Sequence, residues 1–133
     1  MQLPCAPTDD ELFSRVEAWI DHLAQGDFEA AFAYTEHDAY HAWTPVLLRE
    51  VIQGYGLPGR KESERSYEVT PRLAATGGPR TREVDREAKP AHAIAIVRYD
   101  LPLNGAWSDL TSAFRVERRG EGSVLVLEEV HVF

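Results

Sequence analysis

The chain has 133 residues, of which 44% are hydrophobic and 27% charged, and its formal net charge is −8. This composition is typical of one globular domain over residues 1–133 and excludes a disordered or fibrous chain. No apolar run approaches the ~18–20 residues of a membrane helix, and the first residues lack the features of a signal peptide. We therefore expect a cytoplasmic protein without a membrane partner.

The negative charge is concentrated in residues 1–50, which hold ten acidic and two basic side chains, while the remaining residues balance. An acidic segment of this kind repels phosphate backbones, so we expect no nucleic-acid partner. The acids could form a solvated helix surface, or an acidic face that meets a basic protein partner.

Three helices are predicted in the first half of the chain. Thr8 and Glu11 have the spacing of a capping box, and an apolar stripe follows as far as Gly26, which is a natural stop. A short second helix is predicted between Asp27, as its cap, and Thr35. Residues 36–43 have no clear period and are interpreted as a loop.

The third helix is predicted to begin at Thr44-Pro45, a hydroxyl cap followed by proline at the first helical position, and to end at Gly54 and Gly56. From residue 66 onward the hydrophobic period changes to two, which is typical of strands. The predicted strands cover about 66–73, 91–103, 106–118 and 123–132, with a polar hairpin loop at 77–90. The fold class is therefore α+β, with three N-terminal helices packed on a curved four-stranded antiparallel sheet.

The Asn104-Gly105 turn predicts which side chains share a face of the sheet. Phe114 is expected to face the helices beside Ala95, with Asp100 opposite Asp109 on the other face. The outer face also holds Ile94 and Ile96, and the last strand is apolar on both sides. Since three helices cover only one face, we expect a homodimer through the outer face.

The segment Gln25–Ala31 (QGDFEAA), the segment Tyr99–Thr111 (YDLPLNGAWSDLT) and the order of the elements resemble the nuclear transport factor 2-like (cystatin-like, SnoaL-like) cone superfamily, in particular small bacterial proteins of that architecture. The resemblance implies a sheet wrapped around the first helix, a pocket at the wide end of the cone, and dimers through the sheet. It implies no single activity, because this cone serves isomerases, dehydratases, cyclases, hydrolases and non-catalytic binding proteins.

One candidate site lies on the last strand. With a four-residue turn at 119–122, Ser112 faces Glu129, and His131 follows on the same face together with Tyr99. A carboxylate and a histidine in an apolar pocket form a general acid/base pair, so Glu129, His131 and Tyr99 are candidate catalytic residues and Ser112 a candidate ligand contact. One bulge in this strand would send Glu129 and His131 to the other face.

A second candidate site is the junction after the second helix. Its candidate ligand-binding residues are aromatic, imidazole and carboxylate side chains, namely Tyr34, His37, Asp38, Tyr40, His41 and Trp43. The four-residue spacing of His37 and His41 would suit a metal only on a helix and with a third ligand, neither of which is evident. We expect no metal and no cofactor.

Three functions stay open at this point. The leading hypothesis is a protein that binds a small apolar or amphipathic ligand in the cone pocket. The alternatives are a cofactor-free isomerase, lyase or hydrolase that uses the Glu–His pair, and an interaction or immunity-type protein that uses an acidic surface. A cavity filled by Trp19, Phe32 or Phe114 would favour the interaction protein.

Overall fold

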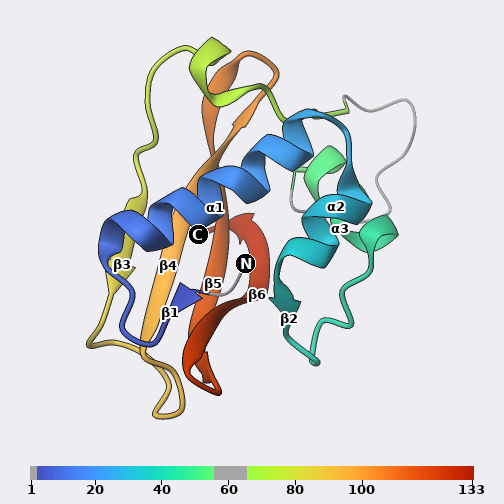
Figure 1. Ribbon diagram of the computed structural model, residues 1–133. Coiled ribbons are helices and arrows are strands. Elements are labelled where there is room, and N and C mark those ends of the chain that lie inside the picture. The colour runs from blue at the N-terminus through green and yellow to red at the C-terminus, as the bar shows by residue number, and fades with distance from the viewer. Residues whose placement is uncertain (1–2, 56–65) are drawn as a thin grey trace.

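The computed structural model describes residues 3–55 and 66–133, and these form an α+β fold (Figure 1). The helices are α1 (Asp9–Ala24), α2 (Phe28–Tyr34) and α3 (Pro45–Gln53), with a 3-10 turn, η1, at Arg72–Ala74. The strands are β1 (Leu3–Pro4), β2 (Glu36–His37), β3 (Arg82–Asp85), β4 (Ala95–Leu103), β5 (Ala106–Arg119) and β6 (Gly122–Val132). None of the described helices is long and apolar enough to cross a membrane.

The strands form one curled sheet in the order β1-β6-β5-β4-β3, and β2 pairs with β6 in parallel. Helix α1 lies across the concave face, while α2 and α3 stand beside the β6 edge (Figure 1). The predicted α+β class, with three helices packed against a curved and mainly antiparallel sheet, is confirmed. The sheet has more strands than the four predicted, because short segments at both edges also pair.

The predicted helix caps are confirmed. The Thr8 hydroxyl accepts a hydrogen bond from the Glu11 amide at 3.2 Å, and the Glu11 carboxylate accepts one from the Thr8 amide at 3.0 Å. The side chains of Asp27 and Thr44 cap α2 and α3 in the same way, at 3.0 Å each. These bonds satisfy amides that a helix start leaves without a partner, so the local sequence sets each start.

The space between α1 and the sheet is filled with side chains. Trp19 of α1 packs edge-to-face on Phe114 of β5, with ring centroids 5.0 Å apart, and both residues are fully buried. Leu12, Val16 and Ile20 complete the buried stripe of α1. The predicted inward orientation of Phe114 is therefore confirmed, but its cross-strand neighbour is Val97 and not Ala95.

The edge of the sheet differs from the prediction. Residues 66–73 form no strand; Val69 makes one isolated bridge to Leu103, and η1 follows. The predicted loop at 77–90 instead contains β3, which pairs with β4. Strand β3 is short. Among the described residues it has a partner strand on one edge only, and Val84 is its one hydrophobic side chain packed against the core, so its sequence is polar like that of a loop.

Two irregularities change the register of the long strands. The pairing of β4 with β5 shifts between Asp100 and Pro102, and that of β5 with β6 shifts between Ala113 and Phe114. The first shift is by two residues, so the side chains of β5 from Thr111 onward keep their predicted faces. The second inserts one residue into β6 and reverses the faces of the residues beyond it.

The acids of the first half of the chain pair largely with arginines of the second half. Arg86 contacts Asp9 at 2.7 Å, and Arg72 contacts Asp21 at 2.8 Å. At least five of the ten acids are engaged in this way, namely Asp9, Glu17, Asp21, Glu36 and Asp38. Much of the acidic N-terminal charge is thus used within the chain.

Replacing Phe114 with alanine should lower the free energy of unfolding by about 3–5 kcal/mol, because the change opens a cavity against Trp19 where the surroundings are close-packed. Denaturant unfolding followed by Trp fluorescence measures the loss. Leu73→Ala is the matched control, since Leu73 is 99% exposed, and it should change stability by less than about 0.5 kcal/mol. A loss below about 1 kcal/mol for Phe114→Ala would contradict this packing.

Candidate functional site

The predicted catalytic group on β6 is not assembled. Glu129 pairs with Ala113 and His131 with Thr111, so both lie on the outer face of the sheet, while Tyr99 and Ser112 face the helices. The prediction that Glu129 faces Ser112 is wrong, because the bulge at Glu128 reverses the end of β6. His131 and Glu129 contact each other at 3.4 Å on the outer face.

Tyr99 belongs instead to a polar cluster beneath α1. Its hydroxyl donates a hydrogen bond to Glu17 at 2.6 Å, and the guanidinium of Arg82 lies 3.6 Å from the same carboxylate and 4.0 Å from the centre of the Phe13 ring. Burial, followed by the bond to Glu17, raises the pKa of Tyr99 to about 12. A phenol in this state holds its proton, so Tyr99 ties α1 to β4.

Ser112 is also used structurally. It is completely buried, and its hydroxyl donates to the Tyr99 carbonyl at 2.8 Å across the β4–β5 pair.

The six candidate residues of the second site divide into separate environments. The Arg15 guanidinium lies 4.2 Å from the centre of the Tyr34 ring. His37 stacks on Phe32 at 3.8 Å, and burial lowers the pKa of the His37 imidazole. The remaining four, Asp38, Tyr40, His41 and Trp43, lie in the loop between β2 and α3.

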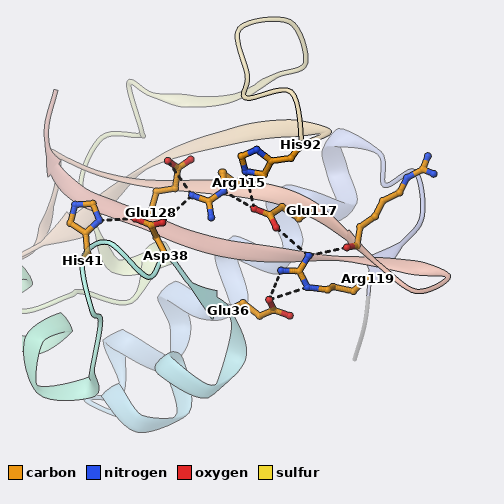
Figure 2. A network of polar contacts seen from close by, with 9 residues as sticks. Glu36, Asp38, His41, His92, Arg115, Glu117, Arg119 and Glu128 are labelled. Carbon is orange, nitrogen blue, oxygen red and sulfur yellow. Dashed lines mark hydrogen bonds and ion pairs between the residues drawn. The ribbon is translucent and has the colours of Figure 1, made fainter.

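Asp38 joins this loop to a network of ion pairs on the outer face, shown in Figure 2. At its centre is Arg115 of β5, which lies 2.7 Å from Glu117, 3.4 Å from Asp38 and 3.6 Å from Glu128. Arg119 extends the network by bonding Glu36 at 2.7 Å and Glu117 at 3.1 Å. We call these six residues the outer-face network: Glu36, Asp38, Arg115, Glu117, Arg119 and Glu128.

Two histidines flank the outer-face network. His41 lies 3.1 Å from Asp38, and His92 lies 3.5 Å from Glu117. Excluding these imidazoles, the network has four carboxylates against two guanidinium groups, an excess of two negative charges.

The two glutamates that contact Arg115 have pKa values shifted in opposite directions. Burial alone would raise the pKa of Glu117, but Arg115 and Arg119 outweigh it and hold the pKa below the ordinary value. Burial also raises the pKa of Glu128, and there the carboxylates of Asp38 and Glu129 add to it and outweigh Arg115. Glu128 is therefore the glutamate of this pair whose charged form is disfavoured, first by burial and then by its acidic neighbours.

The predicted pairing of Asp100 with Asp109 is wrong. Asp100 lies opposite Thr111, is 1% exposed, and accepts hydrogen bonds from the Thr111 hydroxyl at 2.7 Å and from the Arg80 and Thr81 amides. Asp109 accepts a bond from the Tyr55 hydroxyl. The β4–β5 shift separates the two acids, and Asp100 anchors the segment before β3.

The outer face exposes less apolar surface than the sequence suggested. Ile96 is 5% exposed and Val126 is 2% exposed within the chain itself. These two residues lie directly across from Arg115 on the neighbouring strands. The alkyl part of an arginine covers apolar neighbours well, so a second copy of the chain is not needed to bury this patch.

A groove of about 440 Å³ lies between β1 and the start of α1. Leu3, Pro4, Ser14, Arg15 and Tyr34 contribute to its lining. Its volume lies within the range of small-molecule sites. Of the ligand-binding residues predicted from the sequence, Tyr34 lines this groove.

The sequence interpretation missed the glutamates of the outer-face network. Arg115 and Glu117 are two apart on one strand and so share a face, which is a signal that could have been used. The position of Glu128 depends on the bulge, which has no sequence signal. The described residues contain no group of three or more side chains arranged to hold a metal ion.

Comparisons with protein-family models, with curated proteins and with solved structures found no match for this chain.

The opposite pKa shifts predict opposite effects of two conservative changes. Because the pKa of Glu117 is lowered, its carboxylate stabilises the fold at pH values above the ordinary pKa of a glutamate. Glu117→Gln should therefore lower the free energy of unfolding by about 0.5–1 kcal/mol at pH 7. Because the pKa of Glu128 is raised, its contribution is lost as the pH rises, so Glu128→Gln should leave stability unchanged or increase it at pH 7. Denaturant unfolding at pH 7 and at about pH 3 measures both.

Both variants should move toward the wild-type stability as the pH falls toward about 3. The contribution of the Glu117 carboxylate is lost as the pH falls through its lowered pKa, and Glu128 regains its proton. A larger loss for Glu128→Gln than for Glu117→Gln at pH 7 would contradict the assigned electrostatics.

Proposed function

We propose that this chain is a non-catalytic interaction protein that docks a basic protein partner on the outer face of its sheet. The observation that carries the proposal is the excess of carboxylates in the outer-face network, on a sheet face opposite to the one that α1 covers. A partner that brings lysine or arginine side chains would relieve this excess.

The filled interior supports an interaction protein over an enzyme. Trp19 and Phe114 occupy the centre of the space between α1 and the sheet. The polar groups that could have served a reaction there, Tyr99 and Ser112, are bonded to Glu17 and to backbone. Among the residues that the structure describes, no polar groups converge around open space on this face, which argues against acid/base catalysis there.

The partial burial of the network supports selectivity. Arg115 is 15% exposed and Glu117 13% exposed, so charges brought beside them act in a medium of lower effective dielectric than water. Carboxylates held in place by guanidinium groups also lose little side-chain entropy on binding. A lysine or arginine that reaches Asp38 and Glu128 would therefore meet preorganised acceptors.

The test is a titration of the full chain with the dodecapeptide (Lys-Ser)₆, followed by amide NMR shifts, with (Glu-Ser)₆ as the opposite-charge control. The cationic peptide alone should bind, more weakly at 200 mM than at 50 mM salt, and should shift residues of the outer-face network. Shifts confined to the helices would contradict the proposal.

Two variants that remove the same charge locate the surface further. Glu128→Gln should weaken the binding of (Lys-Ser)₆, whereas Glu50→Gln on α3, whose side chain is exposed, should not. Equal weakening by both variants would show that only the total charge of the protein matters, and would overturn the assigned surface.

A second candidate function is the binding of a small amphipathic ligand, which is favoured by the groove between β1 and α1. There Leu3 and Pro4 offer apolar contact, and the stacked Arg15 and Tyr34 offer a polar end. We propose this groove in place of the cone pocket. Membership in the nuclear transport factor 2-like superfamily and a cytoplasmic location are further proposals, the former supported by three helices against a curled sheet.

The homodimer through the outer face also stays a prediction. Light scattering at micromolar concentration should give twice the 15.0 kDa of one chain if it forms. The diagnostic variant is Arg98→Glu, because Arg98 is 31% exposed on this face, whereas a glutamate at the buried Ile96 would damage the fold itself. A wild-type chain that scatters as a monomer would contradict the dimer and leave this face open to another partner.

A further inference from the structure

The loop between β2 and α3, residues 38–43, is fastened at both ends to β6. The Asp38 amide donates a hydrogen bond to the Leu127 carbonyl at 2.8 Å, and the Trp43 indole N–H donates to the Glu128 carbonyl at 3.0 Å. Trp43 is 7% exposed, so it also anchors the loop in the core. The loop therefore has a defined position at the edge of the outer-face network.

The inside of the loop is ordered as well. His41 contacts the Asp38 carboxylate at 3.1 Å and stacks on Trp43, with ring centroids 5.8 Å apart. Ala42 has φ +49°, a left-handed conformation that costs an alanine roughly 1 kcal/mol or more. The contacts on both sides of Ala42 hold this conformation.

Tyr40 is the large hydrophobic side chain that this loop exposes to solvent. Tyr40 is 89% exposed, and its ring meets the His41 ring edge-on at 5.2 Å. His41 in turn contacts Asp38, which pairs with Arg115, and Arg115 also pairs with Glu128. Tyr40 is therefore connected to the outer-face network through His41. An exposed aromatic ring on an ordered loop is a low-entropy contact of the kind that dominates protein interfaces.

We infer that Tyr40 is the anchor of the docking surface, and that it takes an arginine side chain of the basic partner stacked on its ring. This inference rests on the proposed function. A guanidinium fits better than an ammonium, because it is planar and stacks on an aromatic face while its N–H groups remain free for carboxylates. Neighbouring cations of the same segment would then meet Asp38 and Glu128. The partner is therefore an arginine-containing segment rather than a purely lysine-rich one.

The experiment compares (Arg-Ser)₆ with (Lys-Ser)₆ on the full chain by calorimetry. The arginine peptide should bind the wild type more tightly, and Tyr40→Ala should weaken it about 3- to 30-fold, the range of a cation–π contact. Tyr40→Phe should retain the affinity within about twofold, because the ring face remains. Leu73→Ala, which removes a side chain of similar exposure on η1, is the control and should have no effect.

The outcomes separate the two claims. If (Arg-Ser)₆ binds the wild type and Tyr40→Ala equally, the inference is overturned and the acidic docking surface stands. A similar loss of affinity for both peptides in Tyr40→Ala would also overturn the arginine preference. If neither peptide binds the wild type, the proposed function and this inference both fail. Circular dichroism of Tyr40→Ala should match the wild type, since the side chain lies in solvent.

Discussion

The contact between Trp19 and Phe114 sets the arrangement of both faces of this molecule. It joins α1 to β5, the strand in the middle of the sheet, through two fully buried rings. Phe114 and Arg115 are consecutive on that strand, so fixing one toward the helix turns the other outward. The apolar core and the outer-face network are thus two consequences of one strand orientation. A change that moved Phe114 away from Trp19 would also move Arg115 away from its carboxylates.

The distribution of charge along the chain allows ion pairs to form between its two halves. The acids come mostly from the helical half and the arginines from the second half, and they meet in pairs such as Asp9 with Arg86 and Glu36 with Arg119. Individually, exposed pairs of this kind add little stability. Their distribution matters more, because each connects segments far apart in the sequence. Within the outer-face network, Glu128 is the carboxylate on which burial and like charges act together.

The sequence predicted what periodicity and capping control. The starts of α1, α2 and α3 followed from Thr8, Asp27 and Thr44, because cap chemistry is local. The faces of β4 and β5 followed from alternation. The register did not follow, since bulges depend on how two strands fit and leave no local pattern. One inserted residue in β6 therefore moved Glu129 and His131 out of the predicted site. Strand β3 was missed because its polar sequence matches that of a loop.

The same bulge explains why the candidate surface could not be predicted as a unit. Glu128 contributes twice: its side chain contacts Arg115, and its backbone carbonyl accepts the Trp43 indole N–H. The inserted residue therefore joins the loop that carries Tyr40 to the network that carries the charge. Neither segment shows this relation in its own sequence, because loop 38–43 has no period and residue 128 has no regular partner on β5. A binding surface built on a bulge depends on tertiary fit, and a strand without the insertion would leave the loop and the network unconnected.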